Sequence, residues 1–280
     1  MKLLRSPKQL NRELRRPCPR PVGFIPTMGG LHEGHLELVR RARRACASVV
    51  VSIFVNPLQF GPGEDFKRYP RNLARDARAL RAARADVLYA PAEAAFYGPS
   101  FQTPVGVGPL SRPLCGKTRP AHFAGVATVV LKLLNQVRPD RLYLGMKDYQ
   151  QVRVIEQMIA DLDLGVKVVR VPTVREKDGL AMSSRNVFLS PAERIQARLL
   201  AAALKEGEAR VREGWTDVNR IKTQMKKVLR GISGRLDYLE IVDSRSLEPV
   251  VKLTQRSSLL IAIAWFFGRA RLIDSRLIKA

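Results

Sequence analysis

The chain has 280 residues, of which 46% are hydrophobic, and a net charge of +24 at neutral pH. This length can bury one large or two modest cores, as in an ordinary globular protein. The longest apolar run, residues 259–267, is too short for a bilayer, which needs about 20 residues. Residues 1–5 begin basic but lead into no apolar core, which argues against a secretory signal. We therefore expect no membrane segment, and the scattered Cys18, Cys46 and Cys115 indicate reduced thiols in the cytoplasm.

The first 20 residues predict a short amphipathic helix that Ser6 caps and that ends near Pro17. From there to residue 171, continuous apolar runs alternate with runs of helical periodicity. Strands are predicted at residues 22–27, 49–55, 87–89, 142–145 and 166–171. Helices are predicted at residues 36–46, 73–85, 126–137 and 149–162. Residues 91–121, rich in Pro and Gly, predict a long loop, and a loop of that length is usually functional.

The first two predicted strands, at residues 22–27 and 49–55, are mainly apolar and do not alternate with polar residues, which is typical of a parallel sheet covered on both faces. Strands that alternate with helices predict a doubly wound α/β fold. We therefore expect a Rossmann-like, doubly wound parallel-sheet domain over residues 1–175. Ligands of such a domain bind beyond the carboxyl ends of the strands.

The pattern changes after residue 175. Ser190 and Glu193 have capping-box spacing, with Pro191 at the first helical position, and predict a helix to about residue 212. A second helix is predicted at residues 216–229, and strands at 236–243, 258–267 and 271–278. Helices followed by antiparallel strands predict a smaller α+β C-terminal lid domain over residues 176–280.

The segment Pro-Thr-Met-Gly-Gly-Leu-His-Glu-Gly-His, residues 26–35, lies between the first predicted buried strand and a predicted helix. A helix N-terminus presents free N–H groups and partial positive charge, so an anion can bind there. His32 and His35 are three residues apart and should share one face of the first turn. The pattern predicts a phosphate site. Two alternatives are histidines that cap a turn and a metal site, but the chain has only three histidines to serve as ligands.

Four further segments carry dense polar sequence, at residues 51–60, 119–123, 142–151 and 178–186. Together with residues 26–35 they closely resemble the pantoate–β-alanine ligase family, an adenylyl-transferring group with His-x-Gly-His and Lys-Met-Ser-Lys-Ser-like signatures. The resemblance runs from about residue 22 to residue 277. It implies ATP-dependent condensation of pantoate with β-alanine to pantothenate, through a pantoyl-adenylate, with release of AMP and pyrophosphate. It also implies Mg²⁺ and a homodimer.

The resemblance assigns roles to individual residues. It implies catalytic roles for His32, His35 and Lys147. It implies ATP contacts from Met28, His32, His35, Gly145, Lys147, Asp148, Ser183, Ser184 and Arg185. It implies pantoate contacts from Met28, Asn56, Gln59, His122 and Gln151. Tyr69 and Arg119 are further candidates, and Asp76 is a candidate metal ligand.

Structural alternatives stand beside these roles. Lys147 could be a surface lysine paired with Asp148, Ser183 and Ser184 could cap a helix, and Asp76 could be a solvated carboxylate. The side-chain amides of Gln59 and Gln151 could instead only hold neighbouring loops in place by hydrogen bonds. The sequence also departs from the family pattern: Ala121 stands where the family has glycine, which could strain a backbone position with positive φ, and Met146 replaces a polar residue.

Two other functions compete with the ligase. The first is a nucleotidylyltransferase of the same superfamily that stops after one transfer. The second is a basic nucleic-acid-binding protein, since a charge of +24 attracts polyanions. The basic residues are spread along the chain without a recognition motif, so we expect a solvated basic surface and no specific nucleic-acid partner.

Overall fold

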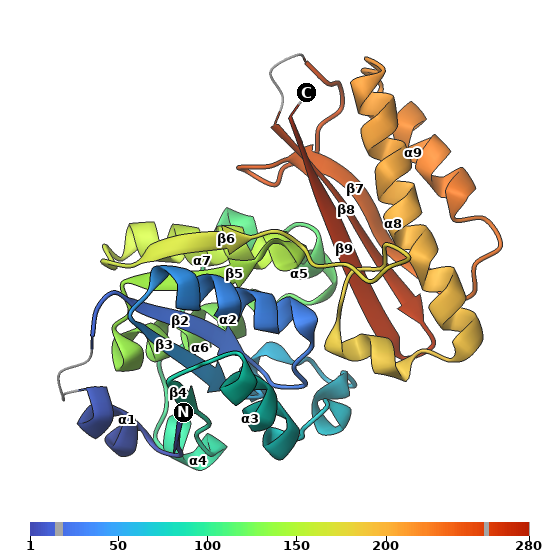
Figure 1. The fold of residues 1–280 in the computed structure, drawn as a ribbon. Coiled ribbons are helices and arrows are strands. Elements are labelled where there is room, and N and C mark those ends of the chain that lie inside the picture. The colour runs from blue at the N-terminus through green and yellow to red at the C-terminus, as the bar shows by residue number, and fades with distance from the viewer. Residues whose placement is uncertain (15–18, 255–257, 280) are drawn as a thin grey trace.

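The computed structural model describes residues 1–14, 19–254 and 258–279, and it shows two units joined near residue 175 (Figure 1). The larger, N-terminal unit is built on a six-stranded sheet in the order β1-β4-β3-β2-β5-β6, and all of its strand pairs are parallel. Its strands are β1 (Lys2–Leu4), β2 (Val22–Thr27), β3 (Ser48–Ile53), β4 (Val87–Tyr89), β5 (Arg141–Gly145) and β6 (Lys167–Val171). The predicted α/β fold is confirmed.

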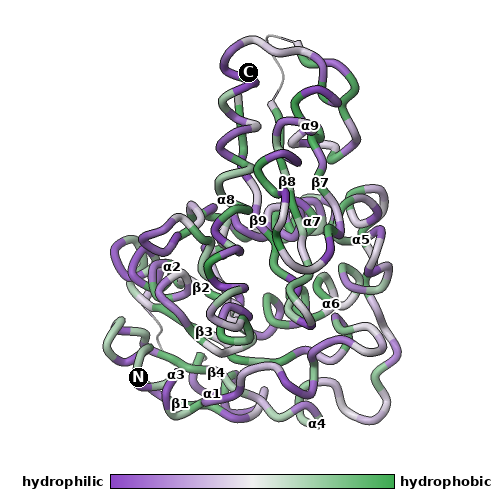
Figure 2. The backbone as a smooth tube through the Cα atoms, turned by 90° about the vertical axis from the view of Figure 1, so that its right-hand side faces the viewer, coloured by the Kyte–Doolittle hydropathy of each residue, from purple (hydrophilic) through white to green (hydrophobic). Residues whose placement is uncertain are grey.

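Helices cover both faces of this sheet because neighbouring strand residues point to opposite faces. Phe24 and Val50 pack in one core, together with residues of α1 (Pro7–Leu14), α6 (His122–Val137) and α7 (Tyr149–Asp161). Ile25 and Val51 pack in another, with residues of α2 (Glu33–Ala45) and α3 (Leu73–Ala82). Figure 2 shows the contrast between apolar α6 and the hydrophilic outer helix α2.

The C-terminal unit is an antiparallel sheet in the order β7-β8-β9 with two helices against it. Its elements are α8 (Pro191–Arg212), α9 (Val218–Val228), β7 (Arg235–Asp243), β8 (Ser258–Phe267) and β9 (Ala270–Lys279). The capping box that opens α8 is formed: the Ser190 N–H donates to Glu193 Oε2 at 2.8 Å, and the Glu193 N–H donates to Ser190 Oγ at 3.3 Å.

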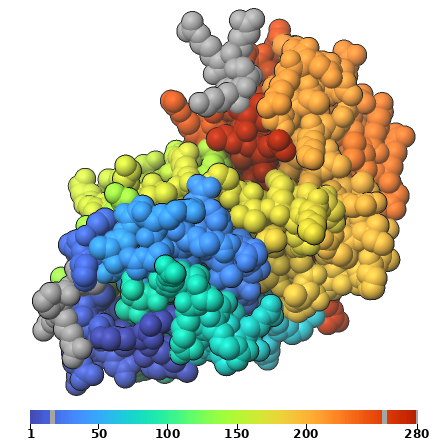
Figure 3. Space-filling model, in the orientation of Figure 1, coloured from blue at the N-terminus to red at the C-terminus, as the bar shows by residue number. Residues whose placement is uncertain are grey.

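Strand β8 joins the two units through its alternating side chains. Ile261 and Ile263 pack against the helices of the C-terminal unit. Leu260 and Ala262, on the opposite face, pack in a cluster that includes Tyr149 of the N-terminal unit. The three-stranded sheet therefore has apolar neighbours on both faces. Figure 3 shows the yellow linking segment filling the space between blue α2 and orange α8.

The structure corrects two features of the predicted N-terminal unit. Residues 2–4 form strand β1 before the first helix, which begins at Pro7 with its Gln9 N–H bonded to Ser6 Oγ at 3.3 Å. The long loop 91–121 contains the short helices α4 (Glu93–Phe96) and α5 (Cys115–Thr118) and the 3-10 turn η3 (Pro109–Ser111). The predicted helix end near Pro17, and Cys18, lie outside the described residues.

Across the described ranges, no helix is long and apolar enough to span a membrane.

One glycine sets how closely α6 approaches the 3-10 turn η1 (Pro57–Gln59). A Cβ at Gly125 would lie 2.2 Å from the Leu58 carbonyl oxygen, well inside van der Waals contact. We predict that Gly125→Ala lowers the free energy of unfolding by about 1–3 kcal/mol, as other overpacked cores do. Thermal unfolding measures it. Gly165→Ala is the matched control, because a Cβ there meets no atom of the described chain within 4 Å, and an unchanged Tm for Gly125→Ala would contradict the close packing.

Candidate active site

The main cavity opens at the carboxyl ends of β2 and β5, where the strand order of the sheet reverses direction. A doubly wound sheet binds its ligands at this crossover because the loops after the two strands leave toward opposite faces. The cavity has a volume of about 850 Å³. Both units line it: Thr27 and Gly145 come from the strand ends, and Arg271 and Ser275 come from β9.

The turn between β2 and α2 is shaped by two glycines and one buried carboxylate. Gly29 and Gly30 have φ of +85° and +61°, a region that other residues rarely adopt. Asp76 Oδ2 accepts from the Gly30 N–H at 2.9 Å, and Asp76 Oδ1 accepts from the Leu31 N–H at 3.0 Å. Asp76 is only 2% exposed and does not line the cavity, so the solvated alternative is wrong. Its two oxygens hold the backbone of the turn.

His32 and His35 cap helix α2 with their Nδ1 atoms. His32 Nδ1 accepts from the Gly34 N–H at 3.1 Å, and His35 Nδ1 accepts from the His32 N–H at 3.4 Å. The ring centroids are 4.1 Å apart, and both rings line the cavity. His32 and His35 therefore cap the helix, as the alternative held, and they also line the cavity at the helix N-terminus, where the phosphate site is predicted.

The protonation of these rings follows from their surroundings. Burial, together with the nearby charge of Lys147, lowers the pKa of His32 to about 4. Burial, then His32 and Lys147, hold the pKa of His35 well below its ordinary value. Both rings are thus neutral near pH 7. Because each Nδ1 accepts a hydrogen bond, each proton is on Nε2, which leaves two N–H donors for the cavity.

Lys147 lies in the 3-10 turn η4 (Met146–Asp148) that follows β5, and it lines the cavity with Gly145 and Asp148. Its Nζ is 3.7 Å from Asp148 Oδ1, so the expected pair exists, but the lysine side chain is only 18% exposed. The pair that the structural alternative expected is therefore present, on a lysine that is partly buried in the cavity wall. Ser275 Oγ of β9 lies 3.4 Å from the carbonyl oxygens of both Met146 and Lys147, so its one proton is shared between the two acceptors.

Two glutamines line another part of the cavity. Gln59 Nε2 lies 3.0 Å from Met28 Sδ, and its Oε1 accepts from Asn56 Nδ2 at 3.1 Å. The Gln151 side chain forms no hydrogen bond to any described residue, so its amide is available to a ligand. Its neighbour Gln150, which was given no role in the sequence analysis, bonds three backbone groups of residues 110–115 through its amide.

Asn56 does not reach the cavity, contrary to the prediction of a pantoate contact. It is 1% exposed and is not among the lining residues. Its Nδ2 donates to the Gly125 carbonyl at 3.0 Å as well as to Gln59, and its Oδ1 accepts from Tyr97 Oη at 2.7 Å. Asn56 therefore holds the side-chain amide of Gln59 in place without lining the cavity itself.

His122 has the opposite tautomer to the other two histidines. Its Nδ1 is 2.9 Å from the Gln59 carbonyl oxygen, which only accepts, so the proton is on Nδ1 and Nε2 is an acceptor. Burial, and then the charge of Arg119, lower its pKa to about 4. Ala121, just before it, has φ of −86°, so the expected strain from a missing glycine is absent.

The segment 183–185 also lines the cavity. Ser183 Oγ accepts from the Arg185 N–H at 3.2 Å and caps the 3-10 turn η5 (Ser184–Phe188), as the capping alternative predicts. Ser184 Oγ is 3.1 Å from Tyr69 Oη. Arg185 pairs with Asp65, a residue that the sequence analysis missed because the two are 120 positions apart.

Within the described parts of the chain, no group of three or more His, Cys, Asp or Glu residues is placed to hold a metal ion. The cavity therefore offers no protein cage for a cation. A Mg²⁺ ion needs only one or two carboxylates when phosphate oxygens supply other ligands, so the residues present fit an ion that arrives with a nucleotide.

Comparisons with known proteins agree along the whole chain. A family model described as pantoate-beta-alanine ligase matches residues 2–277. The chain is 48% identical over 281 residues to the pantothenate synthetase of Thermotoga petrophila, covering 99% of this chain and 100% of that one. It is 52% identical over 261 residues to the pantothenate synthetase of Heliobacterium modesticaldum, covering 93% and 92%.

Solved structures give the same result. The crystal structure of pantoate-beta-alanine ligase (pantothenate synthetase) from Thermus thermophilus has a TM-score of 0.94 and 47% identity, covering 99% of both chains. The enzyme from Francisella tularensis, complexed with beta-gamma ATP and beta-alanine, has a TM-score of 0.82 and 33% identity, covering 99% of this chain and 97% of that one. The chain therefore belongs to the pantoate–β-alanine ligase family.

Proposed function

We propose that this protein condenses pantoate with β-alanine at the expense of ATP, through a pantoyl-adenylate, and releases AMP and pyrophosphate. The observation that carries the proposal is the cavity at the strand crossover. N–H groups that can donate to phosphate and the neutral side-chain amides of two glutamines line this one cavity. Its family membership and the ATP and β-alanine ligands of the Francisella relative support the same reaction.

Adenylation solves a chemical problem, because a carboxylate is too poor an electrophile to react with an amine in water. The pantoate carboxylate attacks the α-phosphorus of ATP and pyrophosphate leaves; the β-alanine amine then attacks the acyl-adenylate and AMP leaves. His32 and His35 donate from Nε2 to phosphate oxygens, and the Lys147 ammonium stabilises the charge that develops on the transferring phosphate. Ser183, Ser184 and Arg185 bind further phosphate oxygens, with Gly145 and Asp148 beside the nucleotide.

Pantoate lies at the end of the cavity formed by Gln59, Gln151 and Met28. Its hydroxyls and carboxylate suit neutral amides, which can donate and accept without transferring protons. His122, with an unprotonated Nε2, adds an acceptor at this end. Asn56 acts indirectly, by holding Gln59. A closed cavity also keeps water from the acyl-adenylate.

We further propose that Mg²⁺ enters bound to ATP and supplies charge neutralisation on the phosphates. The Asp76 oxygens are already bonded to two backbone N–H groups, so Asp76 contributes by holding the turn. Separate cores support a division into a catalytic domain at residues 1–175 and a C-terminal lid at 176–280. The family resemblance supports a cytoplasmic homodimer.

The reaction is tested with pantoate, β-alanine, ATP and Mg²⁺, with pantothenate and AMP measured as products. Pantoate-dependent exchange of pyrophosphate into ATP, without β-alanine, should reveal the adenylate step. AMP should be released only when β-alanine is added. Pyrophosphate exchange without pantothenate formation would favour the nucleotidylyltransferase. If neither exchange nor pantothenate were detected, the proposed function would be refuted.

Replacement of the lysine tests the charge-stabilising role. Lys147→Ala should lower kcat by at least about 100-fold, typical of the loss of one group that stabilises a transition state. Its Tm should stay near the wild-type value, since Lys147 forms only a 3.7 Å pair with Asp148. Lys226→Ala, at an exposed position on α9, is the matched control. Turnover near that of the control would refute the role.

Replacement of the amides tests substrate recognition. Gln59→Ala or Gln151→Ala leaves polar partners unpaired, which costs about 1–3 kcal/mol. The pantoate KM should therefore rise about ten- to hundredfold, since about 1.4 kcal/mol is a factor of ten. The ATP KM should change much less. Gln157→Ala, on the same helix as Gln151 but bonded to the exposed Asp161, is the control; equal effects on both substrates would place these amides at the nucleotide.

The charge of +24 predicts only non-specific binding to DNA or RNA, because dispersed arginines contact phosphates without reading bases. The affinity should fall steeply as salt rises and counterion release loses its advantage. Titrations of unrelated duplexes at several salt concentrations measure it. Sequence-selective binding that persists near physiological salt would revive the nucleic-acid alternative.

A further inference from the structure

Two adjacent acidic residues each hold an arginine of the cavity wall. Glu64 precedes the 3-10 turn η2 (Asp65–Arg68), and both acids line the cavity. Glu64 accepts from Arg119, with Nε to Oε1 at 2.8 Å and Nη2 to Oε2 at 2.5 Å. Asp65 accepts from Arg185, with Nε to Oδ2 at 2.7 Å and Nη2 to Oδ1 at 3.0 Å. The two arginines are on segments far apart in the sequence, and this one dipeptide bonds both.

The two pairs use the same edge of the guanidinium. Each carboxylate takes Nε and Nη2, so the planar group is fixed in orientation by two parallel hydrogen bonds. Among the described residues, neither Arg119 nor Arg185 uses Nη1 in a hydrogen bond. The N–H groups of Nη1 therefore remain for a ligand.

The two arginines have different neighbours in the cavity wall. Arg119 Nη2 also donates to the Gln59 carbonyl at 3.0 Å, and His122 Nδ1 bonds the same oxygen, which places Arg119 beside the amides. Arg185 follows Ser184, whose Cβ would lie 3.3 Å from a Cβ on Gly30, in the turn before α2. Arg185 is therefore beside the helix N-terminus that carries the histidine donors.

The acids remain charged at neutral pH. Burial alone would raise the pKa of Glu64, but the hydrogen bonds and charge of Arg119 outweigh it and leave the pKa below its ordinary value. The same balance, with Arg185 as the partner, lowers the pKa of Asp65. Ring contacts help to order the second pair, since the Arg185 guanidinium carbon lies 5.5 Å from the Tyr69 ring centroid.

We infer that Glu64 and Asp65 are positioning residues for two different substrates. Glu64 directs Arg119 toward a substrate carboxylate at the amide end, and Asp65 directs Arg185 toward the phosphates of ATP. The inference rests on the proposed ligase function. Neither acid touches a substrate: each one orders a flexible arginine before the substrate arrives, which removes part of the entropic cost of binding.

A carboxylate beside an arginine could also act as a competitor of the anionic substrate. The geometry distinguishes the two effects, because a competitor would occupy the edge that the substrate needs, whereas both acids leave Nη1 open. Removal of a competitor would lower the substrate KM. Removal of a positioning group raises it.

The test compares Glu64→Gln with Asp65→Asn in the complete enzyme. Asp65→Asn should raise the ATP KM about tenfold, the change that corresponds to about 1.4 kcal/mol, with less than about a twofold change for pantoate and β-alanine. Glu64→Gln should raise the KM of pantoate or β-alanine by a similar factor and leave the ATP KM nearly unchanged; separate titrations show which carboxylate Arg119 binds. Wild-type enzyme that forms no pantothenate would refute the proposed function instead.

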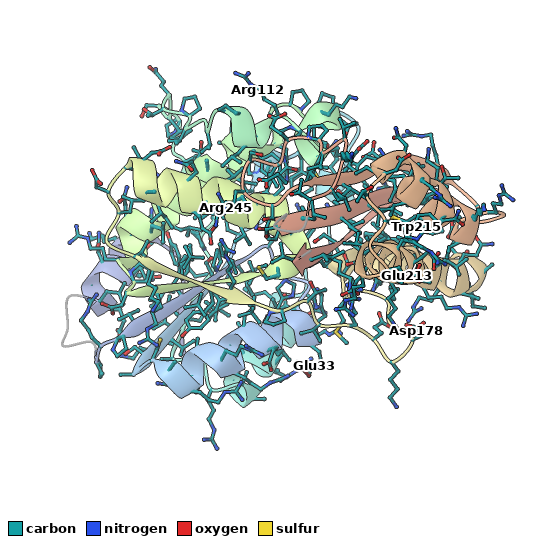
Figure 4. The ribbon with its side chains drawn as sticks, turned by 90° about the horizontal axis from the view of Figure 1, so that it is seen from above. Glu33, Arg112, Asp178, Glu213, Trp215 and Arg245 are labelled. Atoms are coloured by element: carbon teal, nitrogen blue, oxygen red, sulfur yellow. The ribbon has the colours of Figure 1, made fainter. Side chains whose placement is uncertain are left out.

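Glu213→Gln is the matched control, since Glu213 also pairs with an arginine, Arg210, but lies in the C-terminal unit next to Trp215 (Figure 4). If Glu64 and Asp65 only stabilised the loop, both variants would raise the KM of ATP and the KM of the carboxylate substrates together, and that result would overturn the inference. A lowered ATP KM in Asp65→Asn would also overturn it. If either variant does not fold, Arg119→Lys and Arg185→Lys, which keep the charge but lose the bidentate pair, should show the same substrate-by-substrate split.

Discussion

The buried carboxylate of Asp76 is the interaction on which the geometry of the cavity depends. Two glycines give the turn after β2 its unusual backbone, but glycine alone leaves a turn free to adopt other conformations. Asp76 removes that freedom by bonding the N–H groups of Gly30 and Leu31. Because Asp76 belongs to α3, the start of α2 is fixed relative to a second helix, and His32 and His35 face the cavity before any ligand binds.

Local patterns predicted most of the fold, since apolar runs and capping residues report on burial and helix ends directly. Strand β1 was missed because it has three residues and pairs with β4, far away in the sequence, so no local signal marks it. The roles of the site residues came from the family resemblance, and the segments after β2, β3 and β5 were also expected at the cavity because they follow strand ends. Asn56 was assigned wrongly for the same reason: its position at a strand end is right, but its amide points to Gly125. The acidic dipeptide was missed because its partners are distant in sequence.

The three neutral histidines of the cavity differ in tautomer, so they offer a ligand different hydrogen-bonding groups. His32 and His35 accept backbone N–H groups on Nδ1 and so present donors, whereas His122 gives its Nδ1 proton to the Gln59 carbonyl and presents an acceptor. Backbone groups, which cannot ionise, set the tautomer in each case. The cavity thus has a donor side suited to phosphate and an acceptor side suited to hydroxyl or amine protons, without a permanent charge on any ring.

The contact between Ser275 and the turn of Lys147 connects the C-terminal unit to the wall of the cavity. Ser275 belongs to β9, yet its hydroxyl bonds the carbonyls of Met146 and Lys147. Any rotation of the C-terminal unit away from the sheet breaks these bonds and releases the turn that carries the ammonium. If the C-terminal unit is the proposed lid, its opening would admit substrates and displace Lys147 in one movement. In the proposed reaction, ATP that bound before the lid closed would not yet meet the Lys147 ammonium in its final position, so early hydrolysis of the nucleotide would be disfavoured.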